Sequence, residues 1–224
     1  MKTATRLGLA GSALPLFYSI LALFSLHLPL AVSQWLVHPV FLQGYFCAGH
    51  ALVCAFFLLL YLEQRDARLR RAALSGLAAK ICAVVATAIA WWWLAKRDGV
   101  WQGFPETLAR ARTALGLAAG AGMCGFFGLL FSQDAGRHWN RLSGAMKTGV
   151  LAGGLGAALS LVFMLCSFKG GVAFIISAKW GIAMRDAAGI SSILYLVPPV
   201  ASVCFFALLH WKQPRNHNDL SQTL

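Results

Sequence analysis

Charged residues are scarce in this sequence. Asp, Glu, Lys and Arg make up 12% of the 224 residues, whereas a soluble domain carries about 25%. Hydrophobic residues make up 59%, and the mean hydropathy is +0.69. A chain this poor in charge cannot cover its own surface in water, which excludes a soluble globular protein. The composition predicts a single integral membrane domain over residues 1–224, with a polar C-terminal tail at 212–224.

Acidic residues are scarcer still. Seven Asp and Glu stand against 19 Lys and Arg, for a formal net charge of +12. In a soluble protein this imbalance would indicate nucleic-acid binding. Here the basic residues cluster at the ends of apolar runs, as at Arg65, Arg68, Arg70 and Arg71, where they set membrane orientation and contact anionic lipid. The expected partners are therefore the lipid bilayer and anionic lipid headgroups, and no nucleic acid.

Motifs for metal binding and catalysis are lacking as well. No CxxC pair occurs among the six cysteines, which argues against a disulfide framework and a zinc site. They lie inside apolar runs, at Cys47, Cys54, Cys82, Cys124, Cys166 and Cys204. The sequence contains no HExxH, no GxSxG and no paired membrane aspartates. These absences weigh against an enzyme, although a membrane enzyme that modifies lipid stays open as an alternative.

Six long apolar runs predict an all-α polytopic bundle with about six spans. Roughly 20 apolar residues cross the hydrocarbon core of a bilayer. The runs are 7–32, 40–62, 72–95, 113–131, 146–168 and 189–211. Between Lys169 and Asp186 the apolar stretch is short and contains Lys179, which is more typical of an interfacial or re-entrant helix. A seventh span results only if this segment crosses the bilayer.

The basic residues also predict the orientation. With the N-terminus inside, eleven of the 19 Lys and Arg fall in inner segments and seven in outer segments, and Lys80 lies within a span. The positive-inside rule therefore favours cytoplasmic termini, and the expected location is a bacterial inner membrane. The first run also has signal-peptide features, with Lys2 and Arg6 before it and Ser33 near a cleavage position. It is much longer than the apolar core of a signal peptide, so cleavage of residues 1–33 is the less favoured alternative.

Glycines four residues apart mark two consecutive runs. Gly116 and Gly120 lie in the fourth run, and Gly149 and Gly153 in the fifth. Because absent side chains on one helix face let two backbones approach, these two runs are predicted to form a tight antiparallel pair. No internal repeat is found in the sequence.

Polar side chains form a stripe in each of three spans. Residues at three- or four-residue intervals share one helix face. The stripes are Gln43, Cys47, His50 and Cys54 in the second span, Gly76, Lys80, Ala83 and Thr87 in the third, and Ser191, Tyr195, Pro198 and Ser202 in the last. Polar groups inside a bilayer turn toward the bundle interior or a water-filled cavity. The predicted ligand-binding residues are Lys80, His50, Tyr195, Gln43, Thr87 and Ser191.

Lys80 is central to this hypothesis. An ammonium group in the middle of a span needs a partner, and no span contains an acidic residue. An anionic or polar small molecule would supply that partner; the alternative is that the lysine extends along its stem to the inner face. The leading hypothesis is a small transporter or permease-like subunit for such a molecule, with a flexible kink at Pro198 and Pro199.

The histidines leave a second hypothesis open. A haem held across a bundle needs two histidines at similar depth, and only His27 and His38 match, whereas His50 lies at mid-span and His210 at the inner end of the last span. A membrane anchor or assembly subunit of a larger haem- or quinone-linked complex, with partner subunits, is therefore kept as an alternative. No cofactor is assigned.

One stretch resembles a known family. Residues 180–189 (WGIAMRDAAG), followed by 194–201 (LYLVPPVA), are similar to a late helix pair of drug/metabolite exporters of the EamA type. The resemblance covers about a tenth of the chain and implies export of small molecules. Those exporters are usually longer and are built from two repeats, and Gly-Glu generally follows their proline-containing helix, whereas this chain continues with His210, Trp211 and Lys212. The assignment does not rest on this resemblance.

Overall fold

The computed structural model describes residues 2–24, 38–132, 144–167 and 171–211, and within these ranges it contains helices and no strands. The helices are α1 (Lys2–Phe24), α3 (Pro39–Glu63), α4 (Ala67–Lys96), α5 (Glu106–Ser132), α7 (Gly144–Ser167), α8 (Gly171–Trp180), α9 (Met184–Leu194) and α10 (Val197–Trp211). The predicted all-α helix bundle is confirmed.

Five stretches of the described chain are long and apolar enough to cross a membrane. They are Pro39–Glu63, Ala67–Lys96, Glu106–Phe131, Met146–Cys166 and Met184–Trp211, the last formed by α9 and α10 together. Helix α1 packs against α3 and α10, and the predicted first span beyond residue 24 lies outside the described residues. The chain is an integral membrane protein; the span count and the orientation stay predictions.

Two helices begin earlier than the apolar runs predict. Helix α4 begins at Ala67, because the Asp66 carboxylate accepts a hydrogen bond of 2.7 Å from the Arg68 backbone N–H and caps the first turn. Helix α5 begins at Glu106, which pairs with Arg110 one turn later. Hydropathy marks where a lipid-compatible stretch starts, and a helix with a capped polar first turn starts before that point.

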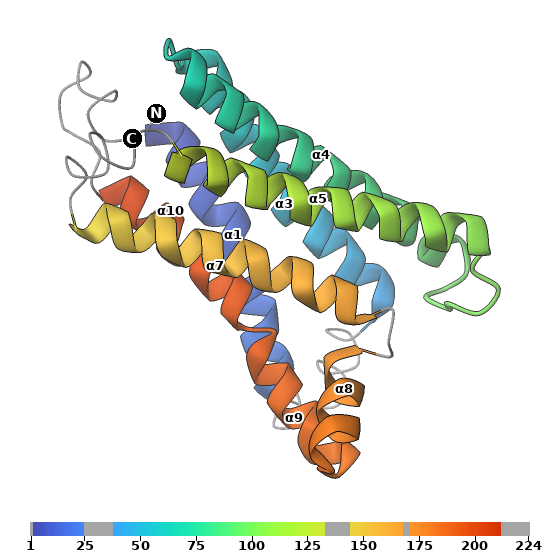
Figure 1. The fold of residues 1–224 in the computed structure, drawn as a ribbon. Coiled ribbons are helices and arrows are strands. Elements are labelled where there is room, and N and C mark those ends of the chain that lie inside the picture. Colours follow the sequence, from blue (N-terminus) through green and yellow to red (C-terminus); the bar gives the residue numbers. More distant parts are fainter. Residues whose placement is uncertain (1, 25–37, 133–143, 168–170, 212–224) are drawn as a thin grey trace.

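The segment between α7 and α10 folds as a short hairpin. Helix α8 has ten residues, a length of about 15 Å, which is half of a hydrocarbon core of about 30 Å. It packs against α7 and α9, around Phe163, Val172, Ile176 and Ala187. Figure 1 shows this hairpin at the end of the molecule away from the start of α1. The short length of α8 is typical of a re-entrant or interfacial helix.

The last span is broken at Tyr195 and Leu196. Helix α10 begins at Val197, so Pro198 and Pro199 fall in its first turn. A first-turn residue needs no intrahelical partner for its backbone N–H, and proline is therefore tolerated there. The kink predicted at Pro198 and Pro199 therefore lies just before them, at the break between α9 and α10.

Six of the described helices form a closed ring. In order around the ring, the contacting neighbours are α1, α3, α4, α5, α7 and α10, and α10 contacts α1 again. Taken in chain order, these six helices make three pairs, α1 with α3, α4 with α5, and α7 with α10. Figure 1 shows the six helices converging near the first turn of α1 and diverging toward the opposite end.

The glycines of α5 and α7 are divided between neighbours. Gly116 and Gly120 lie against Met164 and Leu161 of α7, as the predicted α5–α7 pair requires. Gly149 and Gly156, however, lie against α10, and Gly122 lies against Ala79 of α4. Small residues therefore allow close approach all around the bundle rather than in one helix pair.

Six phenylalanines fill the convergent end of the bundle and are called the phenylalanine ring below. They are Phe56 and Phe57 of α3, Phe126 and Phe127 of α5, and Phe205 and Phe206 of α10, each 4% exposed or less. The centroids within each pair are 4.9 to 5.1 Å apart. Between pairs, Phe57–Phe126, Phe127–Phe205 and Phe206–Phe56 are separated by 4.8 to 5.1 Å. All six contacts are edge-to-face, the geometry that the ring quadrupoles favour.

The same packing unit occurs three times around the bundle. The second phenylalanine of each pair lies on a glycine of the next helix pair: Phe57 on Gly76, Phe127 on Gly153, and Phe206 on Gly8. The local sequences match as well, since 56–60, 126–130 and 205–209 read FFLLL, FFGLL and FFALL. The chain thus contains three similar helix pairs. The sequence alone does not reveal this similarity, because the shared signal is very short and recurs at unequal spacing.

Candidate functional site

A cavity of about 490 Å³ lies inside the helix ring, directly against the phenylalanine ring. Its wall comes from α3, α4, α5, α7 and α10, and Phe127 is a shared member of the wall and of the phenylalanine ring. Along α5 the wall extends from Phe127 to Arg112, a rise of about 22 Å. The cavity is therefore elongated along the bundle and closed at the convergent end.

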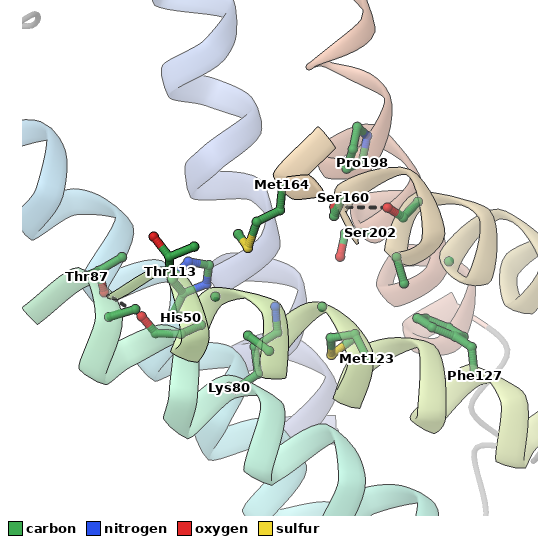
Figure 2. A pocket seen from close by; sticks show the side chains of 18 of the residues that line it. His50, Lys80, Thr87, Thr113, Met123, Phe127, Ser160, Met164, Pro198 and Ser202 are labelled. Atoms are coloured by element: carbon green, nitrogen blue, oxygen red, sulfur yellow. Dashed lines mark hydrogen bonds between the residues drawn. The ribbon is translucent and has the colours of Figure 1, made fainter. Parts of the chain in front are cut away.

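Lys80 extends into this cavity from near the middle of α4. Figure 2 shows its amino group between His50 on one side and Ser160 and Ser202 on the other. Lys80 has no hydrogen bond or ion pair with any residue in the described part of the chain. The side chain is directed into the cavity rather than along its helix toward a membrane surface.

His50 is held at the same cavity by the packing of α3. Gly49, its neighbour, approaches the backbone of Gly11 in α1. One turn earlier, the Cys47 thiol donates to the Val84 carbonyl of α4, with Sγ and O 3.9 Å apart. These contacts fix α3 between α1 and α4, and they direct His50 and Lys80 into one space.

Two threonines lie farther from the phenylalanine ring. The Thr87 hydroxyl donates to the Ala83 and Val84 carbonyls at 2.9 and 3.0 Å, and the Thr113 hydroxyl donates to the Ala109 carbonyl at 2.9 Å. Their hydrogens are thus engaged within their own helices, and they present oxygen atoms to the cavity. Figure 2 shows both beside His50.

Arg112 also lines the cavity, and the sequence analysis missed it. It was assigned to an outer segment because it precedes the fourth apolar run, yet α5 begins at Glu106 and includes it. Its guanidinium carbon lies 5.1 Å from the Trp101 ring centroid, a cation–π contact. The sequence contains a pattern that could have identified Arg112, because Arg112, Gly116 and Gly120 follow at four-residue intervals and share a helix face.

The cavity wall carries basic groups and no carboxylate. Lys80, Arg112 and His50 line it, and no Asp or Glu is among its described lining residues. Glu106, the acid nearest to Arg112 in sequence, is paired with Arg110. In surroundings of low polarity, basic donors without a carboxylate partner attract anionic oxygen strongly. The described residues contain no group of three or more His, Cys, Asp or Glu that could hold a metal ion.

Three of the predicted site residues lie away from this cavity. Tyr195 sits at the break between α9 and α10 and packs on Phe163, with ring centroids 4.9 Å apart. Ser191 is buried and donates to the Ala188 carbonyl at 2.9 Å, and Gln43 is buried near the start of α3. The stripe that grouped Tyr195 and Ser191 with Pro198 assumed one continuous helix, which the break interrupts.

The described histidines do not lie together at one site. His50 is the one histidine among the described lining residues. The His210 ring Nδ1 lies 2.9 Å from the Thr5 hydroxyl and links α10 to α1. His38 is exposed and precedes α3, and His27 lies outside the described residues. No described pair of histidines faces the cavity to hold a haem.

Comparison with known proteins leaves the site to be interpreted from its own chemistry. No protein-family model, curated protein or solved structure matches this chain. The basic, acid-free cavity is accordingly the feature from which function is argued.

Proposed function

We propose that this protein is a small membrane transporter that carries an anionic small molecule through the central cavity. One observation carries the proposal: Lys80, His50 and Arg112 line one intramembrane cavity whose described wall has no acidic residue. An ionisable side chain inside a bilayer is costly unless it is paired, and it usually marks a substrate or ion pathway. An anionic ligand would supply the missing counter-charge.

The architecture supports transport over a purely structural role. Many transporters are built from repeats, some related by an axis along the membrane normal, with the substrate site near the bilayer midplane where the repeats meet. Here three similar helix pairs surround the cavity, and Lys80 and His50 come from near the middle of α4 and α3. This arrangement favours a substrate site over an incidental void.

The phenylalanine ring would act as the closed gate of the pathway. It fills the convergent end of the bundle and seals the cavity on that side. Passage of a ligand requires these edge-to-face contacts to separate while the opposite end closes. With both termini in the cytoplasm of a bacterial inner membrane, the sealed end faces inward, and the cavity receives its ligand from outside.

The test is transport by the purified protein in liposomes. Radiolabelled benzoate, citrate and inorganic phosphate are each offered, and uptake of at least one is expected. Lys80→Met should reduce that uptake at least tenfold. Lys96→Met is the matched control, because Lys96 is exposed at the end of the same helix and lies over Trp92.

Folding of each variant is checked by its elution profile and helical circular dichroism. If no anion enters the liposomes, or if Lys80→Met transports as fast as the wild type, the proposal fails.

A further inference from the structure

The contacts of the phenylalanine ring relate the three helix pairs residue by residue. Gly8, Gly76 and Gly153 are equivalent, because each lies under the second phenylalanine of the neighbouring pair. Four residues after them come Ser12, Lys80 and Ala157. Ser12 is buried and donates to the Leu9 carbonyl, and Ala157 lines the cavity. The fold therefore accepts a small residue at this position, and Lys80 is not needed for packing.

The other basic groups also depart from the repeat. Six residues before Phe56, Phe126 and Phe205 stand His50, Gly120 and Pro199. Fourteen residues before Phe56 and Phe126 stand Leu42 and Arg112. Helix α10 has no residue at that position, because the break at Tyr195 and Leu196 separates it from α9. At each position that can be compared, one helix pair carries a basic side chain and the others carry uncharged residues. The comparison therefore indicates that the basic side chains are not needed for packing of the helix pairs and are specific to the cavity.

These departures make the cavity two-sided. The basic wall, defined as His50, Lys80 and Arg112, belongs to α3, α4 and α5. The apolar wall, defined as Gly156, Ala157, Met164 and Pro198, belongs to α7 and α10. Ser160 and Ser202 are the polar residues on that side, and the Ser160 hydroxyl donates to its own helix at the Gly156 carbonyl. Figure 2 shows Pro198 across the cavity from His50 and Lys80, with the Met164 side chain extending from α7 into the space between them.

We infer that the ligand is an amphipathic organic monoanion, with one oxyanion group against the basic wall and an apolar body against the apolar wall. This inference rests on the proposed function and narrows its substrate class. A cavity of about 490 Å³ lies within the range of about 300–1,000 Å³ typical of small-molecule sites. A hydrophilic polyanion would bring unpaired charge against the apolar wall, where its desolvation is not compensated.

The ligand has two conceivable sources with the same chemistry. A water-soluble aromatic or short-chain carboxylate would reach the cavity from the aqueous phase, and a long-chain fatty acid would reach it from the bilayer. Benzoate and palmitate represent the two sources in the experiment.

The experiment measures binding to the purified full-length protein by ligand-dependent thermal stability and by equilibrium titration. Benzoate and palmitate are compared with benzamide, which is neutral, with benzylamine, which is cationic, and with citrate, which lacks an apolar body. We expect benzoate or palmitate to bind at least tenfold more tightly than the other three. Whichever of the two binds identifies the source.

Variants of both walls complete the test. Lys80→Ser places the residue of the equivalent α1 position on α4 and should weaken benzoate or palmitate at least tenfold without loss of folding. Met164→Gln, of similar size, should weaken the same ligand several-fold by making the apolar wall polar. Lys96→Met should leave binding unchanged.

The two proposals fail in different ways. If citrate or phosphate is bound and transported as well as the amphipathic anions, or if Met164→Gln has no effect, the inference about the substrate class is overturned while the transporter stands. If no anion is bound or transported, the proposed function itself is overturned.

Discussion

The ring of Phe57 occupies the space that a side chain on Gly76 would fill. The two residues belong to adjacent helices, α3 and α4, and the contact recurs between Phe127 and Gly153 and between Phe206 and Gly8. In each case a Cβ atom built on the glycine would overlap the phenyl ring. Since that ring is itself enclosed by other phenylalanines, it has nowhere to move.

Replacing these glycines should therefore destabilise the bundle. Gly76→Ala, Gly153→Ala and Gly8→Ala are each expected to cost about 1–3 kcal/mol through overpacking, seen as a lower melting temperature in detergent. Gly128→Ala in α5 is the control, because nothing lies within 4 Å of its added Cβ. It should be neutral or slightly stabilising, as alanine favours a helix over glycine by up to about 1 kcal/mol. Equal melting temperatures for all four variants would contradict the packing described.

Opening the phenylalanine ring should make the bundle leak. Phe127→Ala removes a ring that closes the cavity and contacts Phe126 and Phe205. The expected loss of stability is about 3–5 kcal/mol by analogy with buried aromatic truncations, accompanied by faster passive efflux of preloaded benzoate from liposomes. Leu58→Ala, 45% exposed on α3, is the control and should change neither property. A folded Phe127→Ala protein with wild-type efflux would show that the ring is no barrier.

Local patterns predicted the scaffold and part of the cavity, and long-range contacts account for the rest. Lys80, His50 and Thr87 could be selected because a polar residue within an apolar run is visible in the sequence and helical periodicity gives its face. Arg112 was missed because the start of α5 depends on a polar first turn, which hydropathy does not detect. Tyr195 was misplaced because the break before Pro198 shifts the face. The phenylalanine ring joins segments from three helices that are distant in the sequence, and no local sequence pattern predicts that these segments are in contact.

A hydrogen bond between α4 and α5 should contribute measurably to stability. The Ser75 hydroxyl donates to the Gly122 carbonyl at 2.9 Å, from one helix to the next. Interhelical hydrogen bonds in membrane proteins average about 0.6 kcal/mol, so Ser75→Ala should lower the free energy of unfolding by roughly that amount. Ser192→Ala is the matched control, because the exposed Ser192 hydroxyl donates within its own helix to the Ala188 carbonyl. Unfolding in mixed micelles measures both variants, and an equal effect would remove the interhelical role of Ser75.

The equivalence of the three helix pairs predicts that the critical amine can be moved. In Lys80→Ser, anion binding should be weakened at least tenfold, and adding Ala157→Lys should restore part of it, because Ala157 lines the same cavity at the equivalent position of α7. Adding Ser12→Lys instead should restore nothing, since Ser12 is buried outside the cavity lining and bonded to the Leu9 carbonyl. Titration of each double variant with the anion that the wild type binds measures the recovery. Recovery with Ala157→Lys alone requires both that the repeat is real and that the positive charge acts from within the cavity. If neither double variant binds while both remain folded, or if Ser12→Lys recovers binding as well, the correspondence between α4 and α7 has no functional meaning.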